Sequence, residues 1–127
     1  MITRRIINTP AAPAPIGPYS QAVLVGDTLY VSGQVPIDPA TGHTITGNIK
    51  DETKRVMENI KAILTQAGMG FENIVKSSIF IIDMNNFAQI NEVYGSFFTG
   101  NFPARETVQV ARLPKDVNVE ISVIAVK

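Results

Sequence analysis

Arg105 is the side chain in this sequence that is best suited to bind a small anion. It lies at the start of an expected strand in the segment 102–107 (FPARET), where Pro103 restricts the backbone just before it. A guanidinium presents a planar fork of N–H donors that matches a carboxylate through two parallel hydrogen bonds. The alternatives are a salt bridge to Glu106 or Glu120, or contact with solvent alone. Taken by itself, the segment favours these ordinary roles over a binding site.

Three further side chains are candidates for work beside such an anion. Glu120 lies in an expected strand among β-branched neighbours, where a carboxylate is unusual unless it is paired or exposed. It would orient or activate a water molecule, or else pair with Arg105 or Lys115. Tyr19 would place its hydroxyl in a cleft, or pack against the edge of a sheet. Asn91, on an expected helix, would donate an amide hydrogen bond or face solvent.

Most of the usual catalytic groups are missing from the chain. There is no cysteine, which excludes disulfides, thiolate nucleophiles and cysteine-bound metals. The one histidine, His43, lies in an expected turn, and no partners for a histidine-based triad stand out. No HExxH motif, metal-spaced acidic cluster or phosphate-binding loop is present. We therefore expect neither a metal nor a cofactor, and a chemistry limited to binding, positioning and a water molecule.

Composition and charge exclude several other classes of protein. The 127 residues correspond to a single domain, 1–127, with 45% hydrophobic residues. Eleven basic residues balance eleven acidic ones, which argues against a nucleic-acid partner or a polybasic membrane anchor. No apolar run has the length of a signal sequence or a membrane span, so a cytoplasmic location is expected. Arg4 and Arg5 leave a mitochondrial address open.

The periodicity of the sequence predicts an α/β (α+β) domain with one six-stranded mixed sheet and two helices on one face. Asn48 or Asp51 would begin the first helix, which the glycines at 68 and 70 would end. Asp83 or Asn85 would begin the second helix, and Gly100 would end it. The expected strands span 2–7, 22–25, 28–35, 74–82, 105–111 and 117–126.

Local signals complete this prediction. The four prolines of the segment 9–18 make it an extended loop rather than a strand. Gly26 and Asp27 predict a two-residue hairpin turn, and Gly33 predicts a bulge or a close backbone approach. The apolar run 79–82 (IFII) is expected to be buried on both sides.

Two helices cover only one face of such a sheet, so the other face needs a different explanation. A face this mixed in polarity is usually buried against another subunit. We therefore expect a homo-oligomer with polar groups lining clefts between subunits. Strand alternation predicts that this second face carries Tyr30, Ser32, Arg105, Thr107, Gln109, Glu120 and Ile124.

Five separated segments, in order, resemble one family along essentially the whole chain. The family is that of the reactive intermediate/imine deaminase A (RidA) proteins, also called the YjgF/YER057c/UK114 family. The segments are 14–22 (APIGPYSQA), 31–36 (VSGQVP), 102–105 (FPAR), 110–116 (VARLPKD) and 119–121 (VEI).

The resemblance implies a chorismate-mutase-like fold, assembled as a homotrimer with three clefts between subunits. The implied reaction is hydrolysis of 2-imino acids and their enamine tautomers, such as 2-iminobutanoate and 2-iminopropanoate, to 2-oxo acids and ammonia. In that reaction Arg105 would bind the carboxylate and Glu120 would hold the attacking water. The family's cleft residues correspond here to Tyr19, Ser32, Gly33, Asn91, Arg105, Thr107 and Glu120.

The sequence departs from the family pattern at three places. Thr107 stands where many members have cysteine, so a thiol is not needed for this chemistry. Glu106 stands where many members have serine, although alternation points it away from the face of Arg105. The segment 99–101 looks shorter than in some relatives, which bears on the size of the substrate.

The main alternative is a binding module that uses the same cleft to sense small carboxylates or 2-oxo acids. Some members of the family have also been described as chaperones, or as endoribonucleases that inhibit translation. The balanced charge and the lack of an aromatic and basic stripe argue against RNA. The presence of Glu120 beside Arg105 favours the enzyme, because a carboxylate binder does not need the second group.

Overall fold

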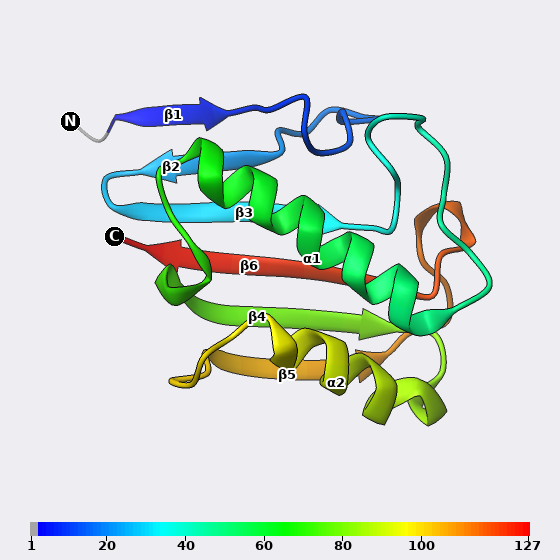
Figure 1. Cartoon of the computed structure of the whole chain (residues 1–127). Coiled ribbons are helices and arrows are strands. Elements are labelled where there is room, and N and C mark those ends of the chain that lie inside the picture. The colour runs from blue at the N-terminus through cyan, green and yellow to red at the C-terminus, as the bar shows by residue number, and fades with distance from the viewer. Residues whose placement is uncertain (1–2) are drawn as a thin grey trace.

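The computed structural model describes residues 3–127, which form one sheet covered by two helices (Figure 1). The expected strand from residue 2 begins at Arg4, and Ile2 itself lies outside the described residues. The helices are α1 (Ile49–Gln66) and α2 (Phe87–Ser96), and short 3-10 turns span Phe71–Asn73, Met84–Asn86 and Pro114–Asp116. The strands are β1 (Arg4–Ile7), β2 (Ala22–Val25), β3 (Thr28–Gln34), β4 (Ile74–Ile81), β5 (Ala104–Gln109) and β6 (Val119–Val126).

The sheet has six strands in the order β1-β2-β3-β6-β4-β5, and the α+β architecture is the one the sequence predicts. All neighbours pair antiparallel except β4 and β5, which are parallel because α2 carries the chain back between them. Gly26, with φ 58°, and Asp27 close the expected hairpin, in which Val25 pairs with Thr28. The predicted bulge is present: the β3–β6 register shifts between Val31 and Gln34, on either side of Gly33.

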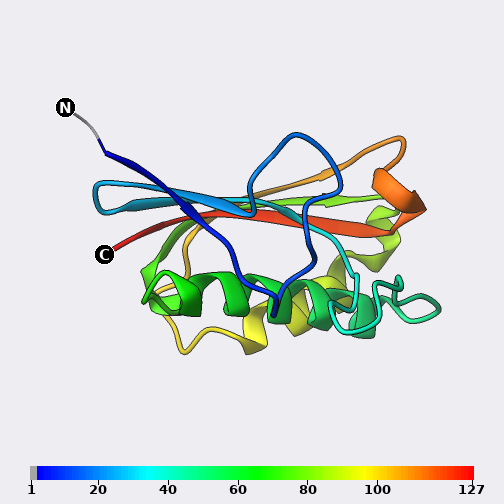
Figure 2. The ribbon, with the colours of Figure 1, turned by 90° about the horizontal axis from the view of Figure 1, so that it is seen from above.

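Both helices lie on the same side of the sheet (Figure 2). The core fills the space between the helices and the sheet. Its fully buried side chains include Ile60, Ile63, Leu64, Ile79 and Ile121. The opposite face carries large apolar side chains that stay exposed in the single chain, such as Tyr30, which is 51% exposed. Among the described residues, no helix has the length and apolar character that crossing a membrane requires.

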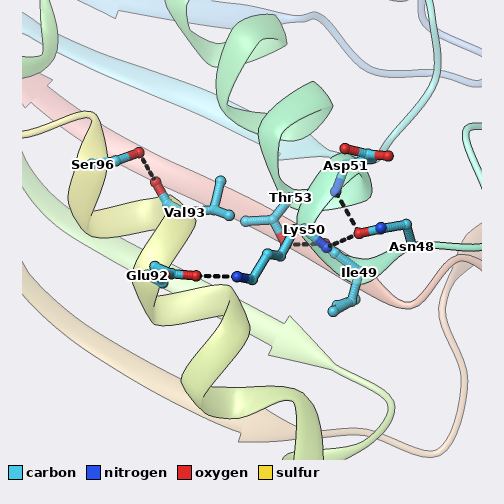
Figure 3. A network of polar contacts seen from close by, with 8 residues as sticks. All are labelled: Asn48, Ile49, Lys50, Asp51, Thr53, Glu92, Val93 and Ser96. Atoms are coloured by element: carbon cyan, nitrogen blue, oxygen red, sulfur yellow. Dashed lines mark hydrogen bonds and ion pairs between the residues drawn. The ribbon is translucent and has the colours of Figure 1, made fainter.

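Polar contacts cap α1 and join its first turn to α2 (Figure 3). Asn48 is the N-cap of α1, and its Oδ1 accepts from the backbone N–H groups of Lys50 (2.9 Å) and Asp51 (3.2 Å). Lys50 also forms an ion pair with Glu92 on α2. Asp83 caps the 3-10 turn that precedes α2. The ion pair thus connects α2, the helix nearest the expected site, to the first turn of α1.

Two expectations about the faces of the sheet are wrong. In the run 79–82, Ile79 and Ile81 are fully buried, but Phe80 and Ile82 are only half-buried, because Phe80 points to the uncovered face. The second error concerns β5.

Strand alternation predicts Arg105, Thr107 and Gln109 on the uncovered face, but they lie on the helix face. The register pairs Arg105 with the buried Ser77, and Thr107 and Gln109 with Ile79 and Ile81 of β4. Directly paired residues point to the same side of a sheet, so all three side chains of β5 point toward the helices.

Candidate functional site

Arg105 lies at the edge of the sheet beneath α2, and three side chains of that helix hold its guanidinium. Its Nη1 donates to Oδ1 of Asn91 at 2.7 Å. Its Cζ lies over the rings of Phe87, at 5.6 Å from the centroid, and Tyr94, at 5.3 Å. Both distances fall within the range of a cation–π contact. One amide and two aromatic rings therefore hold the guanidinium in position.

The spacing on α2 explains why these side chains converge. Phe87, Asn91 and Tyr94 stand at i, i+4 and i+7, which places them on one side of a helix. Tyr94 is buried, and its hydroxyl donates to Oγ of Ser77 on β4 at 2.9 Å. Burial raises the pKa of the Tyr94 hydroxyl, while the hydrogen bond to Ser77 and the charge of Arg105 act in the opposite direction. The tyrosine therefore stays neutral beside the arginine.

The charge of Arg105 is not neutralised by a carboxylate in the part of the chain that the structure describes, because none of its ion pairs includes Arg105. Glu106, the nearest acid in sequence, points to the opposite face. There it accepts from Ser78 and pairs with Lys76 at 3.1 Å. The hydrogen bonds from Ser78 and Lys76 lower the pKa of Glu106. The salt bridges to Glu106 or Glu120 that the sequence left open are thus not formed.

The guanidinium lies in the wall of a surface hollow of about 310 Å³. One wall is α2, and the other is the segment leading into β5. The residues that line it are Asn91, Tyr94, Gly95, Phe102, Pro103 and Arg105. Thr107 lies two residues further along the same face of β5, and its Oγ1 is buried without a hydrogen-bond partner, the one such side-chain atom among residues 3–127. A cation, an amide and an unused hydroxyl suit a small carboxylate with a polar group beside it.

A second cluster lies on the uncovered face and centres on Glu120. This carboxylate is half-buried, and desolvation raises its pKa. It packs directly on Gly33, where an added Cβ would lie 2.5 Å from Glu120 Oε2 and 2.7 Å from its Cδ. Glycine at position 33 is therefore what allows the carboxylate to lie against the β3 bulge.

Tyr19 and Ser32 belong to this second cluster. Tyr19 is 47% exposed, and with Gly33 it lines a small hollow of about 30 Å³. The Ser32 hydroxyl donates to the carbonyl oxygen of Ser20 at 2.6 Å. The backbone N–H of Ser32 donates to the carbonyl oxygen of Gln21 at 2.9 Å. Ser32 therefore fixes the loop that carries Tyr19. Because its O–H already donates, only the lone pairs of the hydroxyl oxygen are free to accept a hydrogen bond from a ligand.

Gln21 is a positioning residue that sequence reasoning missed. Its side chain is buried, and its Oε1 accepts from the backbone N–H of Thr9 at 2.7 Å. Its Nε2 donates to the carbonyl oxygens of Thr9, Ala12 and Pro13 at 3.0–3.3 Å. Figure 2 shows this loop passing from the helix layer to the other side of the sheet. One amide thus holds the proline-rich loop whose end presents Tyr19.

One chain does not bring the two clusters together. Arg105 pairs with Ser77 of β4, whereas Glu120 pairs with Phe80 of the same strand. Ser77 and Phe80 are three residues apart, so they point to opposite faces. Arg105, Asn91 and Thr107 therefore lie on the helix face, and the other predicted residues, Tyr19, Ser32, Gly33 and Glu120, lie on the uncovered face. The sequence had placed Arg105 and Glu120 on one face, and that placement is wrong.

The aromatic rings around Arg105 were also missed as part of the site. Phe87 and Tyr94 have the spacing of core residues on a helix, and Tyr94 is indeed in the core. Their spacing from Asn91 was the available signal. Within residues 3–127 no group of three or more His, Cys, Asp or Glu side chains is arranged for a metal ion. Fold and site together define an α+β protein with a positively charged hollow at the edge of its sheet.

The comparisons with known proteins agree with this class. The family model described as endoribonuclease L-PSP matches residues 9–127. The chain belongs to this family, the YjgF/RidA family that the sequence segments resemble. A RutC family protein of Pyrococcus abyssi is 52% identical over 126 residues, covering 99% of each chain.

Two further relatives carry functional information in their names. The 2-iminobutanoate/2-iminopropanoate deaminase of Capra hircus is 50% identical, with 99% of this chain and 92% of that protein covered. The crystal structure of E. coli TdcF with bound serine has a TM-score of 0.93 and 47% identity, and covers 97% of this chain and 98% of that one.

Proposed function

We propose that this protein hydrolyses reactive 2-imino acids and their enamine tautomers to 2-oxo acids and ammonia. The observation that carries the proposal is the guanidinium of Arg105, which is held by neutral groups and has no carboxylate partner in residues 3–127. The names of the mammalian relatives, at 45–50% identity, support the same reaction. Small substrates such as 2-iminobutanoate and 2-iminopropanoate fit a hollow of this size.

Arg105 would bind the substrate carboxylate through two of its N–H groups. Hydrogen bonds to a charged group contribute roughly 1.5–3 kcal/mol each. Asn91 accepts from Nη1, which leaves Nη2 and the remaining N–H groups for the ligand. The amide and ring contacts hold the fork in position, so the arginine does not have to be ordered when the carboxylate binds.

Glu120 would hold the attacking water by accepting a hydrogen bond from it. The oxygen of the water adds to the imine carbon, the C–N bond breaks, and the water protons end on nitrogen, which leaves as ammonia. Glu120 would accept one proton and return it to nitrogen in this sequence. The raised pKa of Glu120 makes it a better proton acceptor than an exposed glutamate.

The complete site would form between two chains of a homotrimer. Arg105, Asn91 and Thr107 would come from one subunit, and Glu120, Gly33, Ser32 and Tyr19 from its neighbour. The opposite placement of the two clusters in one chain supports this arrangement. So do the exposed apolar side chains on the face that carries Glu120.

A competition assay tests the reaction. A threonine dehydratase generates 2-iminobutanoate, semicarbazide traps the imine, and the protein is added to compete with the trap. We expect semicarbazone formation to fall with wild-type protein and to be restored by Arg105→Ala. The matched control is Arg112→Ala, because Arg112 is an exposed arginine bound to Asp116. Wild-type protein that leaves the rate of trapping unchanged would overturn the proposed function.

A further inference from the structure

We infer that Phe87 and Tyr94 are positioning residues whose ring faces orient the Arg105 guanidinium while leaving its charge free for a substrate carboxylate. The inference rests on the proposed function for the identity of the ligand. The contacts themselves belong to the chain alone.

The geometry of the contacts carries this role. The Cζ of Arg105 lies 5.6 Å from the centroid of the Phe87 ring and 5.3 Å from that of Tyr94. A ring face attracts a guanidinium through its quadrupole and carries no net charge. A carboxylate in the same place would hold the arginine too, but it would also compete with the carboxylate of the substrate. Two rings and the amide of Asn91 thus orient the cation without occupying its charge.

Tyr94 is itself buried and held by two contacts, which make it a fixed support. Its side chain is 4% exposed, and its hydroxyl donates to Ser77 in the sheet at 2.9 Å. Its ring packs against Phe98 with the centroids 4.9 Å apart. Phe98 in turn contacts Phe71 and Phe102 at 5.7 and 6.0 Å. The ring under Arg105 is therefore part of an aromatic cluster beyond the C-terminal end of α2.

The expected effect is on binding rather than on the chemical step. Arg105 would contact the substrate carboxylate equally in the ground state and in the transition state, so looser positioning raises KM and leaves kcat nearly unchanged. Loss of one ring should raise KM roughly three- to thirtyfold, the factor that one cation–π contact represents. Loss of the tyrosine hydroxyl alone should change KM much less.

Three variants separate these effects. Phe87→Leu and Tyr94→Leu each remove one ring and keep an apolar side chain. Tyr94→Phe keeps the ring and removes only the hydrogen bond to Ser77. Because Tyr94 is buried, circular dichroism and the melting temperature are recorded for each variant. Phe87 is partly exposed, so Phe87→Leu keeps the proposal testable if Tyr94→Leu does not fold.

Two readouts keep this inference distinct from the proposed function. The first is the KM and kcat for 2-iminobutanoate. The second is the ¹⁵N–¹H resonance of Arg105 Nε in the full-length protein without ligand, assigned by its loss in Arg105→Lys. We expect a ring-shifted Nε–Hε signal in wild type and Tyr94→Phe, and a move toward free arginine in both leucine variants. Signals and KM values in folded leucine variants that match wild type would overturn the inference. If wild type fails to hydrolyse the imine, the resonance still tests the positioning.

Discussion

The contact between Gly33 and Glu120 allows one substitution to be worked out in detail. In Gly33→Ala the new Cβ would lie 2.5 Å from Glu120 Oε2, 2.7 Å from Cδ and 3.1 Å from Cγ. Ordinary contacts of this kind are about 3.5–4 Å, so the carboxyl group must move by roughly 1 Å. A displacement of that size in a catalytic group costs about a hundredfold in rate, or about 2.7 kcal/mol in the barrier.

The loss should appear in turnover and hardly in stability. Glu120 is half-buried and can swing away, and Gly33 has no positive φ that would strain an alanine. We therefore expect kcat/KM for 2-iminobutanoate to fall about a hundredfold, with a melting temperature close to that of wild type. Adding Gly33→Ala to a Glu120→Ala variant should lower kcat/KM hardly any further, because the carboxyl group that the new Cβ displaces is absent. A further large loss in that double variant, or full activity in Gly33→Ala, would refute the reasoning.

Three other predictions follow from buried or half-buried polar groups. Activity should fall as the pH drops through the raised pKa of Glu120, and this fall should come at a higher pH than for an exposed glutamate. A pH–rate profile whose acid limb is unchanged in Glu120→Gln would contradict this prediction. Glu52, buried and bound by Asn118 Nδ2 at 3.0 and 3.2 Å, also has a raised pKa. The folded state therefore holds its proton more tightly, and stability is lost as pH rises above the unfolded value of 4.5. Glu52→Gln should accordingly raise the melting temperature at pH 7, and the gain should shrink toward pH 4; equal melting temperatures at pH 7 would count against it. Gln21→Leu should cost about 2–4 kcal/mol in urea unfolding, because it leaves buried backbone groups of the 9–13 loop without partners, and a loss below about 0.5 kcal/mol would argue against that role.

Local features of the fold were predictable because each is encoded within a few residues. The hairpin at Gly26 and Asp27, the bulge at Gly33 and the cap at Asn48 all depend on backbone conformation or a nearby side chain. Alternation also separated Arg105 from Glu106 correctly, since neighbours on one strand must point to opposite sides.

The face on which Arg105 lies was not predictable in this way. It depends on how β5 is aligned with β4, and on how β4 is aligned with β6. These registers are set by packing across the whole domain, and a shift of one residue reverses every side chain of a strand. The loop-holding role of Gln21 escaped for a similar reason, because its partners are 8–12 residues away in sequence.

Arg105 of one subunit and Glu120 of another are proposed to form each site. Arg105→Ala and Glu120→Ala, each with its own tag, are co-expressed, and oligomers that carry both tags are purified. In a mixed trimer with sites between neighbours, one interface of the three joins an intact arginine to an intact glutamate. We predict about one third of the wild-type deaminase activity, from two variants that are each nearly inactive alone. Mixed oligomers no more active than the average of the two variants would contradict the claim.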